Sequence, residues 1–236
     1  MKALREFGNT CGNANGRKSE FFNNLSAAAL ADWHSMEHPH SYAQNVVLFA
    51  EKEAARGVFV VLEGEVRTSI NSAEGRRLSL RIARKGDILG LSSTLSGHAY
   101  EMTAETLYPA KIAPIGRREF QAFLSRHPEA YQAVIDELSC QMTMACDQLR
   151  TVALSASAPE KLARLLLEWG ENDQSSEVSC RVRFSLTHEE IGEFIGASRE
   201  TVTRTLSTFK HRRLVSFRGS MLEIPSRTAL ANYANA

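Results

Sequence analysis

The sequence contains little cysteine, and its four cysteines lie far apart. Cys11, Cys140, Cys146 and Cys180 form no C-x-x-C pair, so neither a disulfide framework nor a cysteine zinc site is indicated. No apolar run approaches the ~18 residues of a membrane-spanning helix, and the N-terminal stretch has no apolar signal core. We therefore expect a cytoplasmic protein with free thiols and no membrane partner.

A strong excess of charge of one sign is also missing, because the 236-residue chain has a formal net charge of +1. The overall charge therefore argues neither for nor against nucleic acid, and any electrostatic case must be local. No Cys/His or carboxylate constellation of an enzyme stands out, so catalytic residues are not predicted. This length predicts one or two domains.

Short strand-like runs separated by turns dominate the first half of the chain, from about residue 42 to 116. The turns contain Gly64, Gly75 and Gly86. This pattern predicts an antiparallel sandwich or barrel. We assign residues 21–126 to this β-domain, which opens with a short helix capped by Ser26. Residues 1–20 lack an apolar period and are predicted to be a flexible arm.

A long amphipathic helix is predicted next, over residues 127–154. Its apolar residues recur at alternating steps of four and three for about three heptads, as in a coiled coil. This seam consists of Tyr131, Ile135, Leu138, Met142, Ala145, Leu149 and Val152. Two explanations stay open, since the seam either joins two copies of the chain or packs against the chain's own β-domain. The regular alternation favours a homodimer.

Two short helices in succession are predicted within the C-terminal region, residues 155–236. The first opens with a capping box and ends at a glycine, and a serine caps the second. These ends are marked by Thr187, Glu190, Gly196 and Ser198. The second helix buries an apolar face made of Val202, Leu206 and Phe209. Two helices joined by a short turn with a glycine form a helix-turn-helix.

The exposed face of the second helix is polar in its first two turns. It carries Arg199, Glu200, Thr203 and Arg204, where a recognition helix contacts base edges. Arginine can donate two hydrogen bonds to guanine, and glutamate can accept one from cytosine. The alternative explanation is a solvated helix face with an ion pair.

Local charge and a wing favour the DNA-binding explanation. Between residues 199 and 227, the chain carries seven basic residues and only two acidic ones. The stretch "RLVSFRGSMLEI" predicts two short strands around Arg218, which would place this arginine near a phosphate. Capped helices, a glycine turn, an apolar face and a basic patch therefore coincide in one region.

The stretch "LTHEEIGEFIGASRETVTRTL" resembles the helix-turn-helix of the Crp/Fnr superfamily of bacterial transcription regulators. Over residues 21–230 the order of parts is similar as well. The resemblance implies an α+β fold with an N-terminal antiparallel β-roll of the cyclic-nucleotide-binding type, a long dimerisation helix and a C-terminal winged helix-turn-helix. It also implies a homodimer on a near-palindromic, TGTGA-like operator in double-stranded DNA. Contact with RNA polymerase is expected through the loop at residues 151–159 or through the β-roll.

The resemblance further assigns roles to residues that match the superfamily's motif. Base contacts are expected from Arg199, Glu200 and Arg204. Phosphate contacts are expected from Thr187, His188, Ser198 and Thr201, in addition to Arg218. His188 stands where the catabolite-activator branch has an arginine.

The expected effector pocket departs from the pattern of cAMP-binding members. In those members a glutamate after the last turn glycine holds the ribose, and an Arg-Ser pair holds the phosphate. Here Leu91 follows Gly90, and the stretch "SGHAYE" presents His98 or Ala99 in place of that pair. Burying a phosphate without arginine is costly. We therefore expect a pocket of these four residues and Ser92 that does not take cAMP.

The effector itself stays open, since a small apolar or anionic molecule, or none, fits the sequence. No cofactor and no metal site is predicted. A cyclic-nucleotide-binding module, or a haem- or redox-sensing module of the same superfamily, is the alternative. His34, His38 and His40, beside Asp32, are candidate metal or haem ligands, although such residues are more often exposed polar side chains. Cys11 alone does not supply the cysteine cluster of iron–sulfur sensors.

Overall fold

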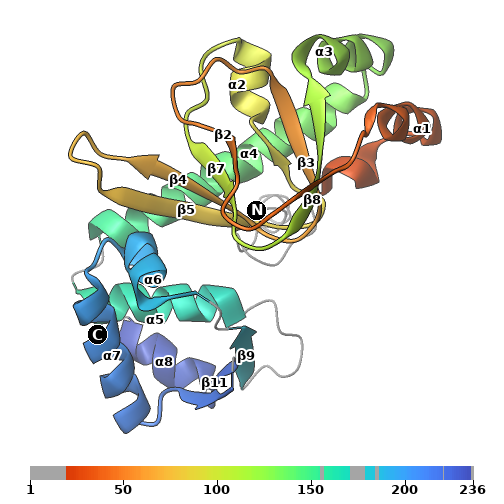
Figure 1. Ribbon diagram of the computed structural model, residues 1–236. Coiled ribbons are helices and arrows are strands. Elements are labelled where there is room, and N and C mark those ends of the chain that lie inside the picture. Colours follow the sequence, from red (N-terminus) through yellow and green to blue (C-terminus); the bar gives the residue numbers. More distant parts are fainter. Residues whose placement is uncertain (1–19, 155–156, 171–178, 184–185, 220, 235–236) are drawn as a thin grey trace, which may run out of the picture. The chain divides into compact units, whose positions relative to one another are not determined.

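The computed structural model describes residues 20–154, 157–170, 179–183, 186–219 and 221–234 (Figure 1). The chain forms two compact units. The N-terminal unit consists mainly of residues 20–75 and 80–143, and the C-terminal unit mainly of the described residues from 144 onward. The predicted arm at residues 1–20 lies, apart from Glu20, outside the described residues.

Two four-stranded sheets built from antiparallel pairs make up most of the N-terminal unit. One sheet has the order β1 (His40–Tyr42), β8 (Ala110–Gly116), β3 (Gly57–Glu63) and β6 (Ile88–Leu89). The other has the order β2 (Val47–Phe49), β7 (Thr103–Thr106), β4 (Val66–Asn71) and β5 (Arg77–Ala83). A core cluster draws on both sheets and includes Phe49, Val61, Val66, Leu89, Tyr100 and Ile112. The antiparallel β-domain predicted from the short strands and glycine turns is confirmed.

The turn between β3 and β4 shows why glycine is needed there. Gly64 has a φ angle of 87°, in the left-handed region that side chains disfavour. A Cβ at this position would lie 2.8 Å from Ala110 on β8. Gly75 and Gly86 also have positive φ angles, so all three predicted turn glycines occupy glycine-like conformations.

Helices pack against the sheet that contains β3 and β8. They are the 3₁₀ turn η1 (Glu20–Asn24), α1 (Ala27–Met36), α2 (Leu91–Ser96) and α3 (Arg117–Arg126). Ser26 caps α1 as predicted, since its side chain accepts a hydrogen bond from the backbone of Ala29 at 3.2 Å. Trp33 of α1 is fully buried and packs its ring 5.1 Å from Phe123 of α3. This aromatic contact fastens α1 to α3.

The long helix α4 (Ala130–Leu149) continues into a π-helical turn, η2 (Arg150–Leu154). The side of α4 that packs into the N-terminal unit carries Ala130, Ala133 and Val134. The predicted seam lies elsewhere on the helix, because Tyr131, Ile135, Met142 and Leu149 are 48%, 54%, 66% and 63% exposed. Of the seam residues, Leu138 packs partly against the core of the unit. The seam is therefore not the face that the chain buries against its own β-domain.

The C-terminal unit packs helices on a three-stranded sheet. Its helices are α5 (Ala158–Gly170), α6 (His188–Ile195), α7 (Arg199–His211) and α8 (Arg227–Ala234). Its sheet has the antiparallel order β10 (Ser216–Arg218), β11 (Met221–Ile224) and β9 (Cys180–Arg183). The two predicted wing strands are confirmed, whereas β9 and α8 were not predicted. Within the described ranges, no helix has the length and apolar character needed to cross a bilayer.

Candidate nucleic-acid interface and effector region

Helix α6, the first helix of the pair, begins with the capping box that the sequence predicted. Thr187 accepts from the backbone of Glu190 at 3.2 Å, and the Glu190 carboxylate accepts from the backbone of Thr187 at 2.8 Å. Gly196 then ends α6 with a φ angle of 63°. A Cβ on Gly192 would lie 2.4 Å from the carbonyl oxygen of Ala197, so the chain turns back directly over this glycine.

Helix α7 is anchored along one face and capped at its start. Val202, Leu206 and Phe209 are at most 4% exposed. The ring of Phe209 lies 5.2 Å from that of Tyr233 on α8. Ser198 accepts from the backbone of Thr201 at 3.3 Å, as an N-cap does. The helix is therefore held rigidly while its opposite face is left to solvent.

The exposed face carries the predicted base-contacting residues. Arg199, Glu200 and Arg204 are all exposed on the first two turns of α7. Across the described part of the chain, neither arginine forms an ion pair with Glu200. The ion pair of the alternative explanation is therefore not found among the described residues, whereas a solvent-exposed face is common to both explanations.

Glu200 is held in its ionised form. Its own backbone N–H and the Ser198 hydroxyl donate to the carboxylate and hold the pKa of Glu200 below its usual range, with a smaller contribution from the charge of Arg199. The position at the start of a helix, where the dipole is positive, favours the same form. An ionised glutamate can only accept hydrogen bonds, which suits the amino group of cytosine.

His188, predicted to contact phosphate, points toward the recognition helix. Its Nδ1 lies 2.8 Å from the hydroxyl oxygen of Thr203. That hydroxyl also lies 2.9 Å from the backbone carbonyl of Arg199. The sequence placed His188 and Thr203 on neighbouring helices without revealing their contact, because fifteen residues separate them.

The wing presents two arginines around one carboxylate. Nε of Arg218 lies 3.1 Å from Glu223, and Nε of Arg181 lies 3.3 Å from the other carboxylate oxygen. Both arginines are more than 60% exposed. Arg181 was missed because its strand, β9, has only four residues and pairs with β11 from a distant part of the chain.

The predicted effector region begins at α2. Gly90 has a φ angle of 74° and precedes this helix, and Leu91 is 1% exposed. Ser92 donates to the carboxylate of Glu101 at 2.8 Å, and Ser93 donates to the other oxygen of the same carboxylate. Glu101 was missed, although it stands in the quoted stretch "SGHAYE".

The other two predicted pocket residues lie outside this hydrogen-bonded group. His98 and Ala99 are exposed. Ala99 pairs with Ala54 in an isolated β-bridge, and the backbone N–H of His98 lies 3.4 Å from the hydroxyl of Ser96. The structure thus brings Ser92 together with a charged group, the carboxylate of Glu101.

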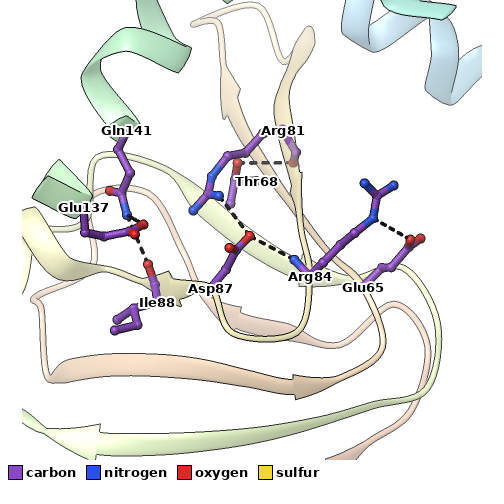
Figure 2. Close-up of polar contacts among 8 residues, drawn as sticks. All are labelled: Glu65, Thr68, Arg81, Arg84, Asp87, Ile88, Glu137 and Gln141. Carbon is purple, nitrogen blue, oxygen red and sulfur yellow. Dashed lines mark hydrogen bonds and ion pairs between the residues drawn. The ribbon is translucent and has the colours of Figure 1, made fainter. Parts of the chain in front are cut away.

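Helix α4 is tied to the strand that leads into the effector region (Figure 2). The side-chain amide of Gln141 donates to Glu137 at 2.8 Å and to the carbonyl oxygen of Ile88 at 3.3 Å. In the turn before β6, Asp87 accepts from the side chain of Arg81 and from the backbone of Arg84, both at 3.0 Å. The segment from β6 into α2 is therefore fixed at both its turn and its contact with α4.

The histidines near α1 do not gather around a shared point. His34 pairs with Glu37 at 3.1 Å. Asp32 instead accepts from Arg126 and His127, which hold the pKa of its carboxyl below its usual range. In the portion of the chain that is described, no group of three or more histidine, cysteine or acidic side chains is arranged to hold a metal ion.

Two family models match the chain in succession. A cyclic nucleotide-binding domain matches residues 39–127, and a Crp-like helix-turn-helix domain matches residues 160–233. The CRP-like cAMP-activated global transcriptional regulator of Mycobacterium tuberculosis is 24% identical over 218 residues, covering 92% of this chain and 97% of that protein. The transcriptional activatory protein AadR of Rhodopseudomonas palustris is 27% identical over 175 residues, covering 74% and 72%.

Solved structures show the same fold. FixK2 of Bradyrhizobium japonicum superposes with a TM-score of 0.74 at 22% sequence identity, and the match covers 85% of this chain and 98% of that one. The two domain models, their order and the relatives that span both of them agree with the fold and with the exposed face of α7. The protein therefore belongs to the Crp/Fnr family and is a DNA-binding transcription regulator.

Proposed function

We propose that the protein acts as a homodimer on a near-palindromic, TGTGA-like operator, with Arg199, Glu200 and Arg204 as the base-reading residues. The observation that carries this proposal is the exposed face of α7, where two arginines flank an ionised glutamate on a firmly anchored helix. Arginine recognises guanine and glutamate recognises cytosine in the major groove. Both bases occur in the TGTGA sequence and its complement.

The seam on α4 supports the dimer. Large apolar side chains are exposed along it, including Met142 at 66% and Leu149 at 63%. Such a row is costly to leave in water, and its spacing suits a two-helix seam. A dimer would present two recognition helices to half-sites about 34 Å apart. By family resemblance, RNA polymerase contacts residues 151–159, of which 155–156 lie outside the described residues, or the β-roll.

Replacing Arg199 by alanine should relax sequence preference at one base pair of each half-site. We expect a loss of about 1–3 kcal/mol in binding free energy on the preferred operator, because a bidentate contact to guanine is removed. Gel-shift titration on a panel of operators, each changed symmetrically at one base pair, measures this directly. The fold should be unaffected, since Arg199 is exposed.

Arg213 provides a matched control for that experiment, since it is exposed beyond the end of α7. Arg213→Ala removes one positive charge and should leave the base preference as it is in the wild-type protein. If Arg199→Ala keeps both the affinity and the base preference of the wild-type protein, the assignment of this residue is wrong.

We also propose that the effector is not cAMP. Leu91 offers no acceptor to a ribose, and the charged group bound to the serines of α2 is the carboxylate of Glu101. A cyclic phosphate placed beside these serines would meet a charge of its own sign. The guanidinium group of Arg117 lies against Gly97 at the far end of α2. Among the described residues, however, no hydrogen bond joins an arginine to these serines, as recognition of a phosphate there would require.

Thermal unfolding with cAMP or cGMP should give the melting temperature of the free protein. A ligand at about 100 times its Kd would stabilise the fold by about 2.7 kcal/mol, which corresponds to several degrees. Operator DNA serves as the positive control and should raise the melting temperature. A rise with either cyclic nucleotide at micromolar concentration would reverse this part of the proposal and restore the cyclic-nucleotide-binding alternative.

A further inference from the structure

The hydroxyl group of Thr203 is engaged entirely within the protein. It lies 2.9 Å from the backbone carbonyl of Arg199 and 2.8 Å from Nδ1 of His188. The carbonyl can only accept, so the hydroxyl donates its one hydrogen to Arg199 and accepts from Nδ1 of His188, in the tautomer that carries its hydrogen there. Both partners of the hydroxyl are therefore supplied by α6 and α7 themselves.

The rest of the side chain is a methyl group, and Thr203 is exposed. Because Oγ1 is drawn back toward His188 and the preceding turn of α7, the methyl group is the part of the side chain left for a ligand. Thr203 follows Arg199 by four residues and Glu200 by three, so it shares their face of the helix. Its methyl group therefore lies among the residues proposed to read bases.

A threonine methyl group has a natural counterpart in the major groove. Thymine carries a C5-methyl group there, and apolar contact with this group distinguishes thymine from the other bases. A free hydroxyl would be less selective, because serine and threonine hydroxyls can bond to several bases. Because His188 occupies the hydroxyl group, Thr203 presents its methyl group to a ligand in place of a polar group that could bond to several bases.

We propose that Thr203 is a fourth base-reading residue, which recognises the C5-methyl group of a thymine in each half-site, and that His188 is the positioning residue that turns its hydroxyl away. The proposal rests on α7 being the recognition helix and adds a base to those read by Arg199, Glu200 and Arg204. It gives His188 a role through Thr203 that a phosphate contact alone would not require.

Deoxyuridine tests the proposal, because it differs from thymidine only by the missing methyl group. Each thymine of the operator is replaced in turn, in both half-sites together, and binding is measured by fluorescence anisotropy. At one position the wild-type protein should lose about four-fold in affinity per half-site, or about fifteen-fold for the symmetric operator, as expected for one buried methyl group. At the other thymines the affinity should change less.

Two variants separate the methyl group from the hydroxyl. Thr203→Ser keeps the hydroxyl and should bind the thymine and deoxyuridine operators equally well at the critical position. Thr203→Val keeps a methyl group and should retain the discrimination. His188→Ala should weaken the discrimination, because only the bond to the carbonyl of Arg199 then holds the hydroxyl away from the DNA. A purely structural role would leave the thymine-to-deoxyuridine ratio unchanged.

The proposal is overturned if no thymine position distinguishes the wild-type protein from Thr203→Ser. That result is separable from a failure of the proposed function. If the proposed function is wrong, the wild-type protein will show no preference for any operator sequence. If only the assignment of Thr203 is wrong, the protein will keep its preference at guanine and cytosine positions and lack only the predicted response to deoxyuridine.

Discussion

Replacing Ile135 and Met142 together by glutamate should turn a dimer into monomers and lower operator affinity by about 10²–10⁴-fold. This is the factor by which the affinity of two linked half-site contacts exceeds that of a single contact. Both side chains are more than half exposed in the single chain, so the new charges cost little in folding. In a seam, however, each would meet the same charge from the second copy without water to screen it. Sedimentation equilibrium and anisotropy on the full operator measure the two effects.

The control places the same two charges on α4 away from the seam. Gln132 and Thr143 are exposed and directly follow the seam residues Tyr131 and Met142. Gln132→Glu with Thr143→Glu should leave both the dimer and the operator affinity close to those of the wild-type protein. If the Ile135 and Met142 variant instead remains dimeric with full affinity, the subunits associate through another surface.

Local chemistry explains why the helix-turn-helix was predictable in detail. Thr187 with Glu190, and Ser198 with the start of α7, satisfy backbone groups only a few residues away, so their spacing alone indicates a helix start. The left-handed conformation at Gly196 is equally local. Ser157 at the start of α5 makes the same kind of local contact, since its hydroxyl accepts from the backbone of Glu160 at 3.4 Å and donates to the carboxylate of Glu160 at 2.9 Å.

Features that depend on distant residues were missed or left open. Strand β9 exists because Arg181 pairs with Glu223, forty-two positions along the chain. A stretch of four residues carries too little pattern to show this. Likewise, nothing in the residues around Glu101 indicates that its carboxylate would bind the serines of α2. The apolar spacing of Phe120, Phe123 and Leu124 could have predicted helix α3. It was missed because these residues fall within the segment that we assigned to the β-domain.

Burial on α4 illustrates the same limit. The seam residues form the more regular apolar row in the sequence, yet the helix packs into the N-terminal unit through Ala133, Val134 and the acidic Glu137. A buried glutamate is unexpected from composition. Its carboxylate accepts from Gln141, which also reaches the carbonyl of Ile88. Small residues and the hydrogen-bonded pair of Glu137 and Gln141 thus pack α4 against the N-terminal unit. The large apolar residues of the seam remain exposed and available to a second copy of the chain.

Replacing Phe209 by alanine should destabilise the C-terminal unit by about 3–5 kcal/mol, because a fully buried ring is removed and a cavity remains. That is a large share of the about 5–15 kcal/mol that stabilises a typical domain. Operator binding should fail at elevated temperature for every sequence alike. Arg199→Ala, on the same helix, should instead leave stability unchanged and alter the response to one base pair.

The chain's two tryptophans make the effect measurable unit by unit, because Trp33 lies in the N-terminal unit and Trp169 in the C-terminal one. In a Trp33→Phe background, urea titration followed by fluorescence reports on Trp169, which is 7% exposed beside Phe194. Phe209→Ala should lower the midpoint of this transition. Lys210→Ala, an exposed change on the same helical turn, should not. Equal midpoints for the two variants would show that Phe209 does not anchor α7, and the assignment of opposite faces for packing and reading would fail with it.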